Sequence, residues 1–85
     1  MSEKKYEKVY VGVIAEFTPD GKLIPKTIIW KDDEKFDIDK VISADRRAST
    51  KAGGVGMRYE CLIGGHIKYI FYEDDNKWFV EGKAG

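Results

Sequence analysis

The chain has 85 residues, which suffices for one domain and leaves no room for a second core. Its 42% hydrophobic and 13% aromatic content is typical of a globular protein and argues against a disordered chain. Fifteen basic and fifteen acidic side chains cancel, so the global charge gives no reason to expect a nucleic acid or an anionic membrane as a partner.

Apolar residues alternate along most of the chain, β-branched and aromatic types dominate, and turn residues recur about every ten positions. This pattern predicts no helix. It predicts six strands, at roughly 8–17, 23–30, 36–44, 57–63, 67–73 and 77–81. The short joints between them favour an antiparallel meander, and residues 1–85 are expected to form a single domain with flexible tails at 1–7 and 82–85.

The segment TPDG, residues 18–21, is typical of a tight turn, because its proline presets φ and its glycine accepts a positive φ. Treated as a four-residue loop, it pairs Phe17 with Lys22 and Val11 with Ile28. One face of this hairpin then becomes almost wholly apolar, which supports that register.

The charged segment after Trp30 is expected to join the second strand to the third, with Trp30 opposite Phe36. The alternation of apolar residues then breaks by one position between Ile38 and Val41. A β-bulge near Asp39–Lys40 would restore it, and bulges supply the bending that barrel closure requires.

The pair Gly64–Gly65 looks like a two-residue hairpin turn. A two-residue loop, however, would place Cys61 opposite Lys68 and would mix apolar and polar side chains on both faces. We therefore predict a three-residue loop, which keeps Cys61 on one face with Ile67 and Tyr69.

In the last hairpin, Asp75–Asn76 is predicted to form the turn. This register places Phe71 opposite Val80 and Glu73 opposite Trp78. It continues the same apolar face into the final strand.

Together these registers divide the apolar side chains between two faces. The predicted inner face holds Val9, Val11, Val13, Phe17, Ile24, Ile28, Trp30, Phe36, Ile38, Val41, Tyr59, Cys61, Ile67, Tyr69, Phe71 and Val80. The predicted outer face holds Tyr10, Ile14, Leu23, Ile29, Leu62, Ile70, Tyr72 and Phe79. Because a flat sheet cannot bury so large an inner face, we predict a bent sheet of five to six strands that closes into a small SH3-like barrel, with an OB-like barrel as the alternative.

Residues 46–58 are the one local charge anomaly: they carry a net charge of +4, while the segments on either side each carry −2. Glycine N–H groups beside basic side chains can form an anion-binding nest, or the segment is only a mobile joint between strands. The candidate residues are Arg46, Arg47, Lys51, Gly53, Gly54 and Arg58. With outward aromatic side chains they could also hold a single-stranded nucleic acid weakly and in a salt-sensitive way.

A second candidate is an apolar patch made by Ile70, Tyr72 and Phe79, which point outward on adjacent predicted strands and could bind a second copy of the chain. Candidate catalytic groups are few. His66, the single histidine, falls at a hairpin tip, and Cys61 is interpreted as a small buried apolar residue. No nucleophile, base and orienting group can be assembled, so we expect no enzyme, metal site or cofactor.

Four segments carry a resemblance: Trp30, FDIDKVI at 36–42, KAGGVGMRY at 51–59 and WFVE at 78–81. This spacing resembles a group of short, uncharacterised bacterial all-β proteins that has no assigned activity. The resemblance implies a compact all-β domain over about residues 9–81. It implies no functional residue.

The sequence therefore predicts a small, non-enzymatic binding or assembly module. Its alternatives are a weak nucleic-acid-binding barrel and a self-associating structural protein, for example a homodimer. The chain start MSEKKYEK lacks the apolar stretch of a signal peptide, and the longest apolar run, VYVGVIA, is too short to span a bilayer. We accordingly expect a soluble cytoplasmic protein without a membrane partner.

Overall fold

A computed structural model of the chain describes residues 6–49 and 54–83 and shows an all-β protein, as predicted. Its strands are β1 (Tyr6–Phe17), β2 (Leu23–Ile29), β3 (Lys35–Asp37), β4 (Lys40–Ser49), β5 (Gly54–Ile63), β6 (His66–Glu73) and β7 (Lys77–Lys83). One turn of 3-10 helix, η1 (Lys31–Asp33), lies between β2 and β3. There are seven strands rather than five or six, because the predicted strand 36–44 is divided into β3 and β4.

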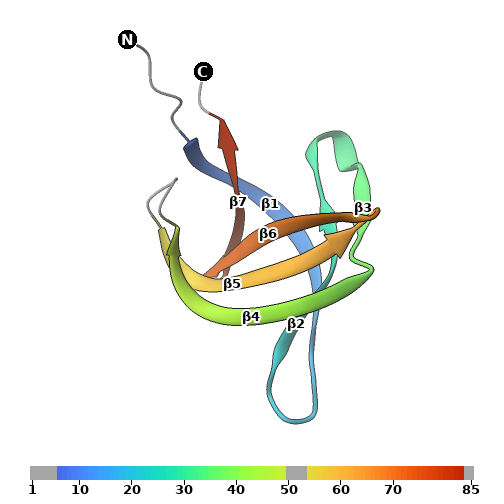
Figure 1. The fold of residues 1–85 in the computed structure, drawn as a ribbon, viewed down its shortest axis with the longest axis vertical. Helices are drawn as coiled ribbons and strands as arrows, with labels where there is room; N and C mark the ends of the chain where they lie inside the picture. Colours follow the sequence, from blue (N-terminus) through green and yellow to red (C-terminus); the bar gives the residue numbers. More distant parts are fainter. Residues whose placement is uncertain (1–5, 50–53, 84–85) are drawn as a thin grey trace.

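All seven strands belong to one sheet, in the order β3-β2-β1-β7-β6-β5-β4 (Figure 1). Neighbours in sequence pair antiparallel, as the meander predicts, except that β3 and β4 lie at opposite edges of the sheet. The first strand pairs with the last instead, with Tyr6 opposite Lys83 and Glu7 opposite Gly82. These four residues, expected in flexible tails, are therefore part of the sheet.

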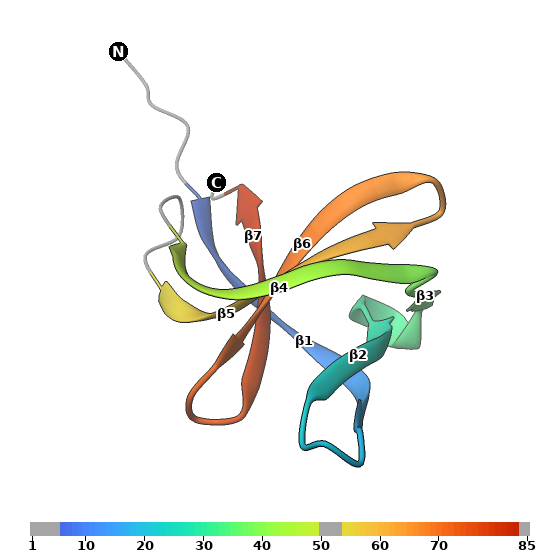
Figure 2. The ribbon, with the colours of Figure 1, turned by 60° about the horizontal axis from the view of Figure 1, so that its bottom comes forward.

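The sheet is strongly curled into a half-barrel (Figures 1 and 2). Within the described ranges no ladder joins β3 to β4, so the predicted closure is not present. The two edges are linked at one corner, where the chain crosses between them. There Ile38 N–H donates to the Lys26 carbonyl at 2.8 Å, and Asp39 N–H donates to the Leu62 carbonyl at 2.8 Å.

This crossing occupies the place of the bulge predicted near Asp39–Lys40. The actual irregularity in the β4–β5 ladder lies between Val41 and Ser43. The break in apolar alternation therefore does mark an irregularity of the backbone. There the chain crosses from pairing with β2 to pairing with β5, and a bulge follows slightly later.

The main core lies on one face of the curled sheet and is built around buried Ile28, Tyr59, Cys61, Ile70 and Trp78. Burial raises the pKa of the Cys61 thiol to about 11, so it remains a protonated, small apolar group. The Tyr59 hydroxyl donates to the Leu23 carbonyl at 2.6 Å, which satisfies a polar group inside the core and ties β5 to β2.

A second, smaller cluster lies on the opposite face of β6 and β7. Phe71 and Phe79 are 2% and 0% exposed and stack with ring centroids 4.9 Å apart. Tyr10 meets the Phe79 ring edge-on at 6.1 Å, and the Lys8 ammonium lies 5.3 Å from the same ring centroid. Both faces of the sheet are therefore buried at β7, whereas the sequence predicted only one buried face.

The turn lengths predicted for the last two hairpins are both wrong. Gly64–Gly65 is a two-residue turn, with Ile63 opposite His66, and both glycines have positive φ, 56° and 81°. These angles suit the twist of a tight hairpin and are accessible to glycine without strain. The last loop has three residues, Asp74–Asn76, and Asn76 takes the left-handed position with φ of 68°.

Each error moves the side chains of the following strand to the other face, so the second error restores the predicted orientation of β7. Only the side chains of β6 point to the face opposite to the predicted one. Ile67 and Tyr69, predicted to point inward, are 46% and 39% exposed, while Ile70, predicted to point outward, is fully buried. Val80 lies on the core side of β7 as predicted, and Trp78 lies on the same side.

The β1–β2 register also differs from the prediction. The loop spans residues 18–22, Phe17 lies opposite Leu23, and the register shifts at Ile14 and Ala15. After this shift Val13, not Val11, faces Ile28. The wider loop leaves Phe17 at the hairpin tip with 72% of its surface exposed, instead of in the core.

Between β2 and β3, η1 replaces the direct pairing of Trp30 with Phe36. Trp30 N–H donates to the Glu34 carbonyl at 2.6 Å, and Phe36 lies opposite Ile28. The register moves by two residues, so the predicted face is kept, but Phe36 remains 40% exposed.

The inner-face prediction is confirmed for most of the core and wrong at defined places. Residues that were predicted inward and lie in or against the main core are Ile28, Tyr59, Cys61, Val11, Val13, Ile38, Val41 and Val80. Residues that were predicted outward but are buried or packed against that core are Ile70, Leu23 and Tyr72. Tyr10 and Ile14 are exposed as predicted, at 52% and 49%.

Candidate ligand-binding cleft

β6 and β7 pair over only a short distance, from Phe71 opposite Phe79 to the connecting turn. Beyond this point β6 continues beside β5 to His66, and β7 continues beside β1 to Lys83. Each strand thus follows the neighbour with which it forms the longer ladder. The two strands diverge as a V, which Figure 1 shows between the upward course of β7 and the sideways course of β6.

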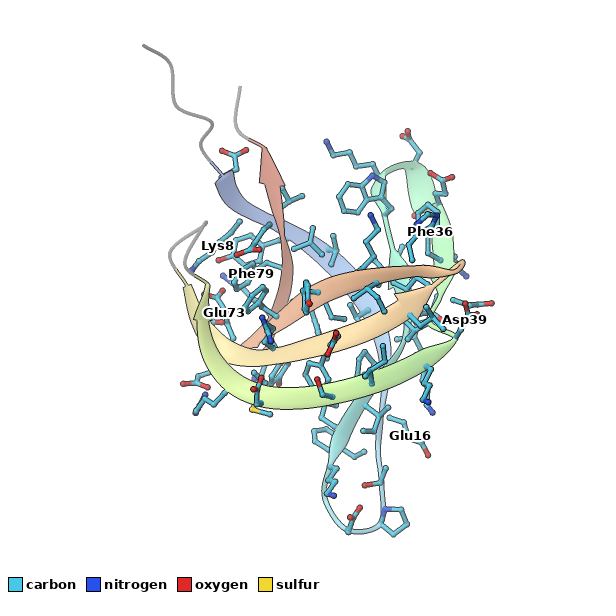
Figure 3. The ribbon with its side chains drawn as sticks, in the orientation of Figure 1. Lys8, Glu16, Phe36, Asp39, Glu73 and Phe79 are labelled. Atoms are coloured by element: carbon cyan, nitrogen blue, oxygen red, sulfur yellow. The ribbon has the colours of Figure 1, made fainter. Side chains whose placement is uncertain are left out.

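A cleft of about 470 Å³ opens where the two strands diverge; we call it the β6–β7 cleft. One wall is formed by residues 67–70 of β6, and the other by Val80 and Glu81 of β7. Ile28, Trp30, Phe36 and Ile63 complete the lining. Figure 3 shows Phe36 on the β3 side of the molecule, well away from the group formed by Lys8, Glu73 and Phe79.

The lining is apolar yet open to solvent. Ile67 is 46% exposed, Phe36 40% and Tyr69 39%, and Trp30 and Ile63 are half-buried. Exposed apolar residues are ordinary when they are scattered, but here several line one concavity. Apolar concavities of this size are the usual form of a ligand site.

Two charged residues flank this apolar lining. Lys68 lies on the β6 wall and forms no ion pair with any residue in the described ranges. Glu81 lies on the β7 wall and is already engaged in an interaction. The β6 side of the cleft therefore offers a cation to an incoming anionic group.

Tyr69 is braced from outside the cleft by Arg58. The Arg58 guanidinium lies 4.6 Å from the centroid of the Tyr69 ring, and its Nε is 4.0 Å from Asp45 Oδ1. That Nε is buried and has no hydrogen-bond partner among the described residues, and the guanidinium also contacts the Tyr69 ring. Arg58 thereby holds one aromatic wall of the cleft.

The predicted basic site is not assembled in the described part of the chain. Arg46 and Arg58 lie within strands, opposite Met57 and Asp45 respectively. Since opposed residues share a face and faces alternate, the two arginines point to opposite sides of the sheet. Arg46 also donates to Asp74 Oδ1 at 3.0 Å.

The other residues of that prediction are placed only in part. Arg47 lies in β4 and Gly54 in β5, where Gly54 pairs with Ser49. Lys51 and Gly53 lie outside the described residues. The anion-binding hypothesis thus stays a prediction, but Arg46 and Arg58 cannot serve one ligand from the same face.

The predicted self-association patch is wrong. Ile70 and Phe79 are 0% exposed, and Tyr72 is half-buried against the core. Ile70 belongs to the main core, while Phe79 stacks with Phe71 in the cluster on the opposite face. The three side chains therefore form no common surface, because the predicted loop parity had inverted β6.

Sequence reasoning missed the cleft for the same reason. A two-residue turn at Gly64–Gly65, which the glycine pair itself suggested, would have placed Ile67 and Tyr69 outside the core. Their neighbour across the cleft, Phe36, could be recognised only after the turn η1 had set its register.

A polar group on the other side of the sheet connects β1 to β6 across β7. Lys8 Nζ lies 2.5 Å from Glu73 Oε2, and the Tyr10 hydroxyl donates to Glu73 Oε1 at 2.8 Å. The hydrogen bond from Lys8, then that from Tyr10, lowers the pKa of Glu73, and the bond to Glu73 raises the pKa of Lys8. This group covers Phe79 and stabilises the fold; it does not reach the cleft.

The lowered pKa of Glu73 predicts a pH dependence of stability. The stabilisation by its carboxylate is present above the ordinary pKa of 4.5 and is lost as the pH falls through the lower pKa of the folded state. Between about pH 6 and about pH 3, Glu73→Gln should therefore lose less unfolding free energy than the parent protein. Urea unfolding at both pH values measures this difference.

The matched control is Glu16→Gln, because Glu16 is 55% exposed and its ion pair with Lys26 spans 3.4 Å at the surface. This variant should keep the parent's pH slope. An unchanged slope in Glu73→Gln would contradict the role given to the Lys8–Glu73 contact.

The described residues hold no cluster of three or more side chains suited to a metal ion, and no helix with the length and apolar character needed to cross a membrane. The walls of the β6–β7 cleft come from β2, β3, β5, β6 and β7, so the site is a product of the whole half-barrel. No family model, curated protein or solved structure matches this chain.

Proposed function

We propose that this protein is a small non-enzymatic binding module and that the β6–β7 cleft is its ligand site. The observation that carries the proposal is that three exposed apolar residues, Ile67, Phe36 and Tyr69, line one cleft of about 470 Å³. An apolar group that enters would release water from these side chains at a gain of roughly 25 cal/mol per Å² of apolar surface.

The ligand class follows from the walls. The body of the ligand is apolar, to match Trp30, Phe36 and Ile63, and an anionic group lies on the β6 side near Lys68. For the fold we favour the SH3-like class over the OB-like class, since the sheet is a meander with a single 3-10 turn between strands in the described ranges.

The two earlier alternatives have weaker support. Nucleic-acid binding needs basic side chains on one face, and Arg46 and Arg58 lie on opposite faces. Self-association through Ile70 and Phe79 needs both side chains at the surface, and both are buried.

The proposal is tested with 8-anilinonaphthalene-1-sulfonate, an apolar anion whose fluorescence rises in apolar sites. It should bind the native protein, and Ile67→Glu should weaken binding about tenfold, because a carboxylate then occupies the mouth of the cleft. Fluorescence titration measures the affinity, and near-ultraviolet circular dichroism shows that the variant keeps its tertiary packing.

The matched control is Ile14→Glu, since Ile14 is 49% exposed against 46% for Ile67 and does not line the cleft. This variant should bind the dye like the parent protein. Equal affinities of the parent and both variants, or equal losses in both variants, would reject the cleft as the site.

A further inference from the structure

We infer that the β6–β7 cleft binds an extended polypeptide segment, which adds to the open edge of β6 as an additional strand. The inference rests on the proposed function and names its partner: a peptide with apolar residues at alternate positions and one carboxylate near Lys68. Three features of the cleft support it: an open backbone edge, a row of apolar side chains beneath it, and the distribution of charge.

The open edge follows from the hairpin register. In a two-residue hairpin the closing pair, here Ile63 with His66, exchanges ladder hydrogen bonds, and such pairs alternate along the ladder. Ile67 and Tyr69 belong to the alternate pairs, so their backbone N–H and C=O groups point away from β5. On that side β7 has already diverged, since its pairing with β6 ends at Phe71.

An open edge of this kind is a template for another strand. An added polypeptide can pair its own N–H and C=O groups with those of Ile67 and Tyr69, which a small apolar molecule cannot do. Peptide recognition by strand addition takes affinity from these main-chain bonds and specificity from pockets for alternate side chains.

The apolar lining supplies such pockets. Because side chains of a strand alternate between faces with a period of two residues, every second side chain of the added segment would point into the cleft. There it would meet Trp30, Phe36 and Ile63. The volume of about 470 Å³ suits several aliphatic side chains.

Charge completes the description of the partner. Lys68 lies between Ile67 and Tyr69 on β6 and lacks an ion-pair partner within residues 6–49 and 54–83, whereas Glu81 stands on the opposite wall. A carboxylate of the peptide is therefore attracted to the β6 wall. The Lys68 charge therefore favours an acidic residue in the part of the peptide that pairs with β6.

The probe is a blocked octapeptide with valine or isoleucine at every second position, serine between them and one central glutamate. Two isomers carry N-methyl groups, each on one of the two alternate sets of residues. Only one set can donate its N–H groups to β6, so one isomer should bind at least about tenfold more weakly while the other keeps most of the affinity. Isothermal titration calorimetry gives the affinities.

Two further readouts locate the strand. The parent peptide should slow hydrogen exchange of the Ile67 and Tyr69 amides at least about tenfold, because both become hydrogen-bonded. Lys68→Glu should reverse the charge preference, so that a peptide with a central lysine binds better than the glutamate peptide. Lys40→Glu, a change at an exposed lysine of β4, should leave the preference unchanged.

Each outcome is decisive. Binding of the dye without binding of the octapeptide would overturn strand addition and leave the proposed function intact, whereas loss of both would reject the two together. Equal binding of both N-methylated isomers would also overturn the inference, since the main chain would then play no part. Protection of Ile67 and Tyr69 at high protein concentration without peptide would assign the edge to a second copy of the chain and contradict a peptide partner.

Discussion

Replacing Phe79 by alanine is expected to lower the free energy of unfolding by about 3–5 kcal/mol. Phe79 is 0% exposed, stacks on Phe71 at 4.9 Å and meets Tyr10 edge-on at 6.1 Å. Its loss removes these ring contacts and leaves a cavity under the Lys8 ammonium, which lies 5.3 Å from the ring centroid. Urea unfolding followed by tyrosine and tryptophan fluorescence measures the change.

The total stability of a domain of this size is of the order of 5–10 kcal/mol, so the loss would consume a large part of it. For a chain of this length, each kcal/mol corresponds to a shift of roughly 4–8 °C in Tm. If Phe79→Ala is too unstable to purify, Phe79→Leu provides a graded substitution, because it keeps an apolar side chain of smaller volume in the same place.

Phe17→Ala is the matched control. It distinguishes the register predicted from the sequence from the register of the structure. Apolar alternation alone placed Phe17 inside and Phe79 outside, while in the structure Phe17 is 72% exposed and Phe79 fully buried. Phe17→Ala should therefore change stability by less than about 0.5 kcal/mol. A larger loss at Phe17 than at Phe79 would show that the register of the structure is wrong.

The second large effect is expected at Gly56, where alanine should destabilise the protein by about 3 kcal/mol or more. A Cβ atom at this position would lie 2.2 Å from the Tyr72 carbonyl oxygen and 2.9 Å from its carbonyl carbon. Those atoms belong to the backbone of β6 and cannot rotate aside. The β5–β6 ladder must then separate at the pair formed by Gly56 and Glu73.

Gly12→Ala is the comparison for this effect. A Cβ atom at Gly12 would lie 3.3 Å from Ile29 Cβ, where a few tenths of an ångström of adjustment relieve the contact. Its loss of unfolding free energy should be less than half of that for Gly56→Ala, measured under the same conditions. Similar values for both variants would contradict the close approach of β5 and β6.

Gly56 also changes the interpretation of the basic, glycine-rich stretch. From the sequence this glycine belonged to a mobile joint or an anion-binding nest, because glycine and basic residues occur together there. In the structure Gly56 is part of β5, and the close approach of β6 accounts for the missing side chain. A glycine needed for packing and a glycine needed for a loop look the same in a sequence.

The candidate site could be predicted from the sequence less well than the fold could. Its walls include Ile67 and Tyr69, whose exposure depends on one residue of loop length at Gly64–Gly65. They also include Phe36, whose position depends on the turn η1. A loop that differs by one residue costs little locally, yet it moves every side chain of the next strand to the other face.

The residue pattern alone was enough to predict an all-β chain, most of its strand limits to within a few residues, and a core around Ile28, Tyr59 and Cys61. Those properties follow from local preferences, since β-branched and aromatic residues at alternate positions favour half-buried strands wherever they lie. The tertiary structure alone decided that β1 pairs with β7, that the sheet stays open between β3 and β4, and that β6 and β7 diverge to form the cleft. The physical reason is that pairing between distant strands and the curl of the sheet depend on the summed packing of the whole chain, which no local pattern records.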